Sequence, residues 1–201
     1  MKPKIKSIFL NMTGIILILF SFLQFYTIYL SKTPHHIFWL CNHVPLVMGL
    51  AILFRNNFVL IGEFSLDFIG MLTWDLDFIY FLLTNKSFTG NEAFFTFGNY
   101  LGITAILHFL TLPLALIAII LIGKVRKRAF IFSIFHFLII IPILIYFGKD
   151  YNLNCLFKSC LEFIPTFRFY TVFLLLFYLF VFIIPITYLI NRMLEKIKNK
   201  N

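Results

Sequence analysis

The residues best suited to chemistry stand in the segment "HHIFWLCNHVPL", which runs from His35 to Leu46. It places Cys41 two residues before His43 in a chain that is otherwise mostly apolar. A thiol and an imidazole are the minimum for nucleophilic acyl transfer: the thiolate attacks a carbonyl carbon, and the histidine carries the proton. Residues two apart on a helix point about 200° away from each other, so His43 is not the favoured partner of Cys41. The alternative is that Cys41 is a small buried hydrophobe.

The composition indicates which kind of scaffold holds these residues. The chain has 201 residues, of which 61% are hydrophobic and only 12% are charged. A soluble domain carries about twice that share of charge. Apolar runs of roughly 20 residues, long enough to cross a hydrocarbon core, recur along the whole length. We therefore expect an all-α, polytopic membrane helix bundle that forms a single domain over residues 1–201.

Polar breaks divide the chain into six expected transmembrane helices. The breaks are "SKTP", "RNN", the stretch from Thr84 to Asn99, "GKVRKR" and the segment from Gly148 to Phe169. The expected spans lie near residues 8–30, 36–54, 58–82, 100–123, 129–147 and 170–191. The first of them is too long for the apolar region of a signal peptide and lacks a small-residue cleavage site, so we expect it to be retained.

The distribution of lysine and arginine predicts the orientation. If both termini are cytoplasmic, twelve basic residues fall inside and five outside, which is a clear positive-inside bias. We therefore expect a multi-pass protein of the cell membrane with both termini in the cytoplasm. The net charge of +9 is therefore mostly cytoplasmic and faces anionic headgroups. The basic runs are short juxtamembrane flanks, and nothing indicates binding to nucleic acid.

Counting residues along these spans brings the candidate catalytic residues to a similar depth. At about 1.5 Å per residue, Cys41 lies about 7 Å, His43 about 10 Å and His108 about 12 Å below the outer surface. Asp77 lies near the outer end of the third span. Cys41, His108 and Asp77 are therefore the predicted nucleophile, base and orienting carboxylate. The candidates for substrate contacts are His43, Asn42, Trp74 and Asp75.

The third span carries acidic residues on one helix face. Glu63, Asp67, Gly70, Trp74 and Asp77 follow one another at spacings of four and three residues. Carboxyl groups avoid lipid, so this face should line an internal cavity. The alternatives are that the acids bond to polar groups of other helices, or that Asp77 and its neighbour Asp75 cap the outer end of the helix.

The remaining histidine and cysteines are less informative. His136, in "FSIFHFLII", is interpreted as a satisfied core histidine of the inner half. Cys155 and Cys160, in "NCLFKSCLEF", lie in an outer loop, where either a disulfide bond or two reduced thiols are open.

Three segments, "WLCNHVPLVMGLAILFRN", "GMLTWDLDFIYFLL" and "LGITAILHFLTLPLAL", resemble the six-span YwaF-like bacterial membrane proteins. These are related to eukaryotic transmembrane acyltransferases that remodel ether phospholipids, and more distantly to the androgen-induced type of lipid ester hydrolase. The resemblance covers about 40% of the chain, in the second to fourth spans. It implies that Cys41 accepts the acyl group and that His108 is its base. The resemblance assigns no role to the "WDLDF" acids.

The leading prediction is therefore an intramembrane acyltransferase or lipid ester hydrolase, with no cofactor, acting on a phospholipid or lysophospholipid. A metal-dependent hydrolase, with His43, Asp77 and His108 as zinc ligands and Cys41 as an optional further one, is a second possibility. A third is a proton or cation transporter that uses the carboxylates of the third span. A structural subunit is the default if no activity is found.

Overall fold

The computed structural model describes residues 2–89, 95, 101–147, 152–159 and 168–199, and its regular elements there are all helical. They comprise α1 (Pro3–Leu30), η1 (Pro34–Phe38), α2 (Leu40–Leu53), α3 (Asn57–Thr84), α5 (Leu101–Ile122), α6 (Phe130–Phe147), η2 (Leu153–Cys155), α7 (Tyr170–Phe177), η3 (Tyr178–Ile183) and α8 (Ile184–Lys198). The expected all-α class is confirmed.

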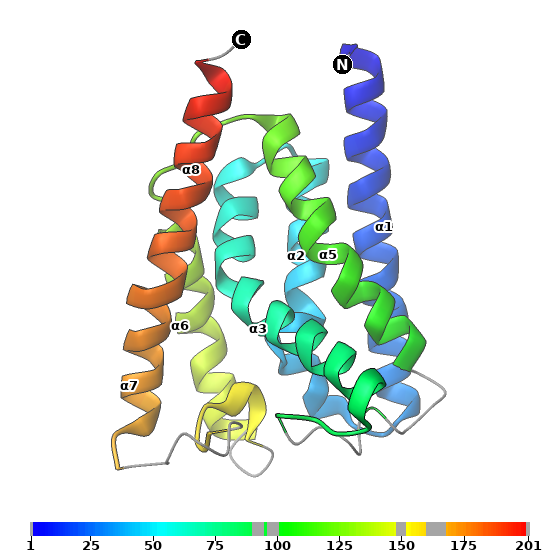
Figure 1. The fold of residues 1–201 in the computed structure, drawn as a ribbon, viewed down its shortest axis with the longest axis vertical. Helices are drawn as coiled ribbons and strands as arrows, with labels where there is room; N and C mark the ends of the chain where they lie inside the picture. The colour runs from blue at the N-terminus through cyan, green and yellow to red at the C-terminus, as the bar shows by residue number, and fades with distance from the viewer. Residues whose placement is uncertain (1, 90–94, 96–100, 148–151, 160–167, 200–201) are drawn as a thin grey trace.

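The long helices run up and down in one bundle (Figure 1). The start of α1 and the end of α8 lie at the same end, which we call the terminal end. The connections α2–α3 and α5–α6 also lie there, whereas η1 and η2 lie at the opposite, far end. α3 crosses the middle of the bundle and packs against α2, α5, α6 and the α8 rod, so its side chains can meet residues from most other helices.

Within the described residues, three helical rods are long and apolar enough to cross a membrane: Pro3–Leu30, Leu101–Ile122 and Tyr170–Lys198. α2 and α6 are apolar but shorter, and α3 is 28 residues long but carries four acidic residues. The outward face of α1 exposes large apolar residues, among them Ile8, Met12, Ile15 and Leu19. Soluble proteins rarely leave such continuous apolar surface uncovered. The chain is a membrane protein on this evidence.

α1 and α2 approach each other closely at a pair of glycines. A Cβ atom added to Gly14 would lie 2.9 Å from the carbonyl oxygen of Gly49, and one added to Gly49 would lie 2.9 Å from that of Gly14. Neither position has room for a side chain. Small residues let two helix backbones approach this closely, and such pairs are common where helices pack inside membranes. There, van der Waals attraction between the helices takes the place of the hydrophobic effect as a driving force for packing.

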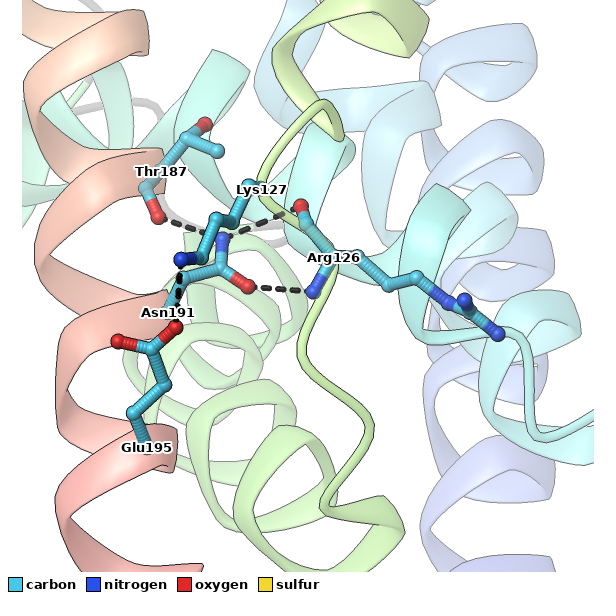
Figure 2. A network of polar contacts seen from close by, with 5 residues as sticks. All are labelled: Arg126, Lys127, Thr187, Asn191 and Glu195. Carbon is cyan, nitrogen blue, oxygen red and sulfur yellow. Dashed lines mark hydrogen bonds and ion pairs between the residues drawn. The ribbon is translucent and has the colours of Figure 1, made fainter.

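Asn191 holds α8 to the loop between α5 and α6 (Figure 2). Its side-chain oxygen accepts a hydrogen bond from the backbone N–H of Arg126, and its Nδ2 donates to the carbonyl oxygen of Arg126 at 3.1 Å. Nearby, Lys127 Nζ and Glu195 Oε1 form an exposed ion pair at 2.9 Å. The hydrogen bond to Glu195 raises the pKa of Lys127. The buried amide, rather than the exposed ion pair, is the main fastening here.

The last rod contains a π-helical segment, η3, directly before α8. Pro185 stands in the first turn of α8 and has no backbone N–H, so an α-helical bond is missing there. π-Turns commonly accommodate such a defect inside a longer helix. The first residue of the segment, Tyr178, directs its hydroxyl to the carbonyl oxygen of Leu66 on α3, at 3.0 Å.

Candidate functional site

Three titratable side chains from three helices form one hydrogen-bonded chain inside the bundle. Glu63 Oε1 on α3 lies 2.7 Å from His136 Nδ1 on α6. The other ring nitrogen of His136, Nε2, lies 3.1 Å from Nε2 of His43 on α2. His43 Nδ1 is 3.0 Å from the carbonyl oxygen of Ile37 in η1. The side chain of Glu63 is completely buried, and that of His136 is 12% exposed.

The packing of α3 against α6 positions this chain. Ser133, one turn before His136, donates a hydrogen bond to the carbonyl oxygen of Gly62 at 2.7 Å. Gly62 directly precedes Glu63, so this contact sets the two helices at the height where the carboxyl group meets the imidazole. His136 is hydrogen-bonded on both ring nitrogens, as expected of a satisfied core histidine, but its partners are themselves titratable.

Cys41 is a free, partly buried thiol that packs against the apolar core. It lies within the electrostatic reach of two carboxyl groups of α3, those of Asp67 and Asp75. Tyr178 also interacts electrostatically with Cys41 and Asp67. The thiol therefore shares its electrostatic surroundings with a polar group of side chains from α3 and η3, whereas His43, two residues further along α2, points about 200° away from Cys41.

The surface of the bundle comes close to this group at Gly70. Gly70 is exposed, whereas Asp67, less than one turn away, is 1% exposed. A Cβ atom added to Gly70 would lie 3.3 Å from Asp67 Oδ1 and 3.9 Å from the hydroxyl oxygen of Tyr178. Because Gly70 has no side chain, the buried polar group that includes Asp67 and Tyr178 lies close to the surface of the bundle at this position.

His108 on α5 is 1% exposed and packs against Trp74 of α3, with 4.0 Å between the ring centroids and an angle of 44° between the ring planes. Among the described residues neither of its ring nitrogens has a hydrogen-bond partner. The predicted base is therefore buried beside the predicted substrate residue Trp74. No hydrogen bond joins it to Cys41 or to Asp77 in this part of the chain.

Asp77 accepts hydrogen bonds from three residues near the far end of α3. Its carboxylate accepts hydrogen bonds from the backbone N–H of Phe88 at 2.8 Å, from the hydroxyl of Ser87 at 2.7 Å and from the hydroxyl of Thr89. These contacts tie the segment after α3 back onto the helix, in line with the capping alternative. Asp75 is 9% exposed, and its Oδ1 has no hydrogen-bond partner among the described residues.

Asn42 belongs to a buried amide network that joins three helices. Its Nδ2 donates to the carbonyl oxygen of His36 at 2.7 Å, and its Oδ1 accepts from Gln24 Nε2 at 3.2 Å. Gln24 Oε1 in turn accepts from the hydroxyl of Thr104 at 2.9 Å. We did not predict this network. Its signal in the sequence is Gln24, a polar residue far inside the apolar run of the first helix.

The far end also holds the paired histidines and the loop cysteine. The rings of His35 and His36 meet edge to face at 4.5 Å. Burial lowers the pKa of His36, which lies before the start of α2, to about 4, and the neighbouring charge of His35 acts in the same direction. Cys155 is disulfide-bonded, and Cys160 lies outside the described residues.

Within the part of the chain that the structure describes, no group of three or more His, Cys, Asp or Glu side chains is arranged to hold a metal ion. The ring nitrogens of His43 instead form hydrogen-bond contacts with His136 and with the carbonyl oxygen of Ile37. The carboxylate of Asp77 accepts hydrogen bonds from the segment that follows α3. The geometry thus offers no support for the metal-dependent alternative.

Comparison with known proteins adds no assignment: no protein family, no curated protein and no solved structure matches this chain.

Proposed function

We propose that the chain is an integral membrane enzyme that transfers an acyl chain from a phospholipid to Cys41 and then to a lysophospholipid or to water. In this proposal six helices cross the membrane, counting the α7–η3–α8 rod as one. The terminal end of the bundle faces the cytoplasm. Two features support this orientation: α1 begins and α8 ends at the same end, and most basic residues cluster there.

The observation that carries the proposal is the setting of Cys41. A free thiol lies within the electrostatic reach of carboxyl groups that are buried in the bundle, and one oxygen each of Asp67 and Asp75 lacks a hydrogen-bond partner among the described residues. An unpaired buried polar group costs about 1–3 kcal/mol. Intramembrane groups kept at such a cost usually serve a function. A bound ester with its polar headgroup would supply the missing partners.

The chemistry follows from a thiol and a histidine. Sγ of Cys41 attacks the ester carbonyl carbon while His108 takes up the thiol proton. The tetrahedral intermediate collapses, the C–O bond breaks, and His108 returns the proton to the leaving alcohol. Water or the hydroxyl of a lysophospholipid then attacks the thioester, and the thiol is restored. His108 suits this role because no other residue in the described part occupies its ring nitrogens, and such contacts often tighten only with substrate.

The remaining candidate residues take different parts. Trp74 fixes the ring of His108, and Asp75 is available to a polar headgroup. Asn42 and His43 are held by other partners and shape the site indirectly. We assign Asp77 to fastening the far end of α3 rather than to orienting His108.

A lipid would enter laterally at Gly70. The exposed glycine stands over Asp67 and Tyr178, both of which interact electrostatically with one another and with Cys41. An acyl chain can remain among lipids while the ester carbonyl reaches the thiol. The substrate need not leave the bilayer.

Intact mass spectrometry tests the proposal. Purified protein incubated with phospholipid should gain the mass of one acyl chain, and hydroxylamine should remove it. Cys41→Ser should abolish the gain, and His108→Ala should slow it by about 100-fold or more, as expected for loss of a general base. His36→Gln serves as the histidine control and should behave as wild type. An unmodified wild-type protein under trapping conditions, or an adduct that persists in Cys41→Ser, would overturn the proposal.

A further inference from the structure

The chain of Glu63, His136 and His43 takes no part in the acyl transfer proposed above, yet all three of its members have ionisable side chains. Its contacts are 2.7 Å between Glu63 Oε1 and His136 Nδ1, and 3.1 Å between the two Nε2 atoms. It connects α3, α6 and α2 in a region where ionisable groups are costly. If these contacts only held the helices together, amide or hydroxyl side chains could make them at a lower cost in free energy.

The positions of the protons follow from the partners. The carbonyl oxygen of Ile37 can only accept a hydrogen bond, so Nδ1 of His43 carries a proton. The two Nε2 atoms face each other, and their contact is a hydrogen bond only if one proton lies between them. One further proton is needed between Nδ1 of His136 and Oε1 of Glu63. A fully bonded chain thus holds three protons.

Three arrangements contain these same protons and keep every hydrogen bond. In the first, Glu63 is protonated and both histidines are neutral. In the second, that proton has moved to Nδ1 of His136, which leaves a carboxylate and an imidazolium. In the third, the proton on Nε2 of His136 has also crossed to His43, which is then the cation. The net charge of the group is zero throughout, so each transfer avoids adding charge to the interior.

The two ends of the chain face different surroundings. Oε2 of Glu63 is buried, has no hydrogen-bond partner among the described residues, and shares the electrostatic neighbourhood of Asp67, which in turn couples to Asp75. At the other end His43 is partly exposed and contacts η1, which contains His35 and His36. Among the described residues, the ionisable groups on the α3 side are Asp67 and Asp75, with Cys41 and Tyr178 interacting electrostatically with Asp67, and those on the other side are the two histidines of η1.

We propose that Glu63, His136 and His43 form a proton relay that exchanges protons between the buried carboxyl groups of α3 and the far end of the bundle. A cationic His43 releases its Nδ1 proton to water at η1, which leaves Glu63 as a carboxylate and both histidines neutral. Uptake of a proton from water at Nδ1 of His43, followed by the reverse sequence of transfers, reprotonates Glu63. The relay is independent of acyl transfer and requires no role for Cys41. It supplies protons to an interior that water reaches poorly.

Infrared spectroscopy of the protein in lipid nanodiscs can test the relay. The carbonyl stretch of the protonated Glu63 carboxyl group is identified by its loss in Glu63→Gln. After a rapid change from H₂O to D₂O, its exchange rate is measured in wild type, His136→Gln and His43→Gln. Glutamine can still form hydrogen bonds but cannot pass a proton on at neutral pH. Both variants should exchange at least about tenfold more slowly, because protonation by a positioned imidazole is lost.

Thr187→Val is the matched control. It removes a buried hydrogen bond of 2.9 Å between α8 and Ser65 of α3 without removing a titratable group or a contact between α3 and α6, and it should exchange at the wild-type rate. Cys41→Ser should also match wild type, which separates the relay from the proposed acyl transfer. Equal rates in His136→Gln, His43→Gln and wild type would overturn the relay.

A second measurement needs only the wild-type protein and so remains valid if a variant fails to fold. Nitrogen-15 spectra of labelled histidine should show His43 protonated at Nδ1 and a coupling between the two Nε2 atoms through their shared proton. A His43 ring protonated only at Nε2, or two Nε2 atoms with no coupling, would refute the proton arrangement on which the relay depends.

Discussion

Replacing Asn191 with alanine tests what fastens the terminal end of the bundle. The side chain makes hydrogen bonds to both the backbone N–H and the carbonyl oxygen of Arg126, and a third bond, at 2.8 Å, goes to the carbonyl oxygen of Thr187. Thr187 lies one turn earlier in the same helix, so its carbonyl keeps a backbone partner after the substitution. The two bonds to Arg126 have no such replacement.

The size of the effect follows from those two bonds. A typical intramolecular hydrogen bond contributes about 1 kcal/mol net, so Asn191→Ala should lower the free energy of unfolding by about 2 kcal/mol. Glu195→Gln is the matched control on the same helix. It removes an exposed ion pair with Lys127, which salt and side-chain entropy weaken, and it should change the stability little.

Reversible unfolding in mixed micelles with increasing amounts of a denaturing detergent measures both variants. Repeating the titration at high salt should reduce any effect of Glu195→Gln and leave that of Asn191→Ala unchanged, because the amide carries no charge. If Asn191→Ala matches wild type while Glu195→Gln unfolds early, charge rather than the buried amide holds the loop, and the reasoning is wrong.

Three further predictions concern other parts of the bundle. Gly14→Leu should lower the stability by at least about 1–3 kcal/mol in the same titration, because its side chain would overlap the backbone of Gly49. The stability of the wild type should fall as the pH drops from about 6.5 toward 4, because the pKa of His36 is lowered to about 4 in the folded protein. In this range the unfolded chain binds a proton at His36 and the folded protein does not. Thermal midpoints measured at several pH values should show a smaller loss of stability in His36→Gln. Gly70→Leu should slow the formation of the acyl adduct with little change in stability, because Gly70 is exposed and the added Cβ atom, 3.3 Å from Asp67 Oδ1, requires that carboxyl group to shift by only a few tenths of an ångström; an unchanged rate would rule out entry at this position.

The helices could be predicted from the sequence, because apolar runs bounded by polar breaks are a strong signal. The expected spans at 100–123 and 129–147 match α5 and α6 to within one residue at each end. The second span was expected at 36–54, but α2 begins only at Leu40, after the short 3₁₀ turn η1. The bond from Asn42 to the carbonyl oxygen of His36 shows why: a side chain takes the place of the helical partner.

The meeting of His43 with His136 could not be predicted by counting residues from the outer surface. That count assumes that every helix spans the full hydrocarbon core of about 30 Å. α2 has 14 residues and is therefore only about 21 Å long. A short helix between longer ones shifts the relative depth of its residues, and it brings His43 beside a histidine that was placed in the other half of the membrane. Contacts of this kind depend on tilt and length, which composition does not fix.

The surroundings of Asp77 show a similar limit. Its place near the end of a helix was evident, and the capping alternative was open on that basis. Its three hydrogen-bond donors come from residues 87–89, which lie ten to twelve positions along the chain. Only the path of the chain after α3 determines that these residues turn back onto the helix.

The π-helical segment η3 also constrains the length of the chain. Each residue of an α-helix advances by about 100° around the axis, so adding or deleting one residue between Tyr178 and Ile183 would turn the preceding part of the rod by about that angle relative to α8. Tyr178 would then lose Leu66 and face lipid, while Asn191 on the far side of the segment stayed with its loop. Substitutions that keep the residue count preserve both contacts. The number of residues in this rod, as much as their identity, thus determines how its two halves are rotated relative to each other.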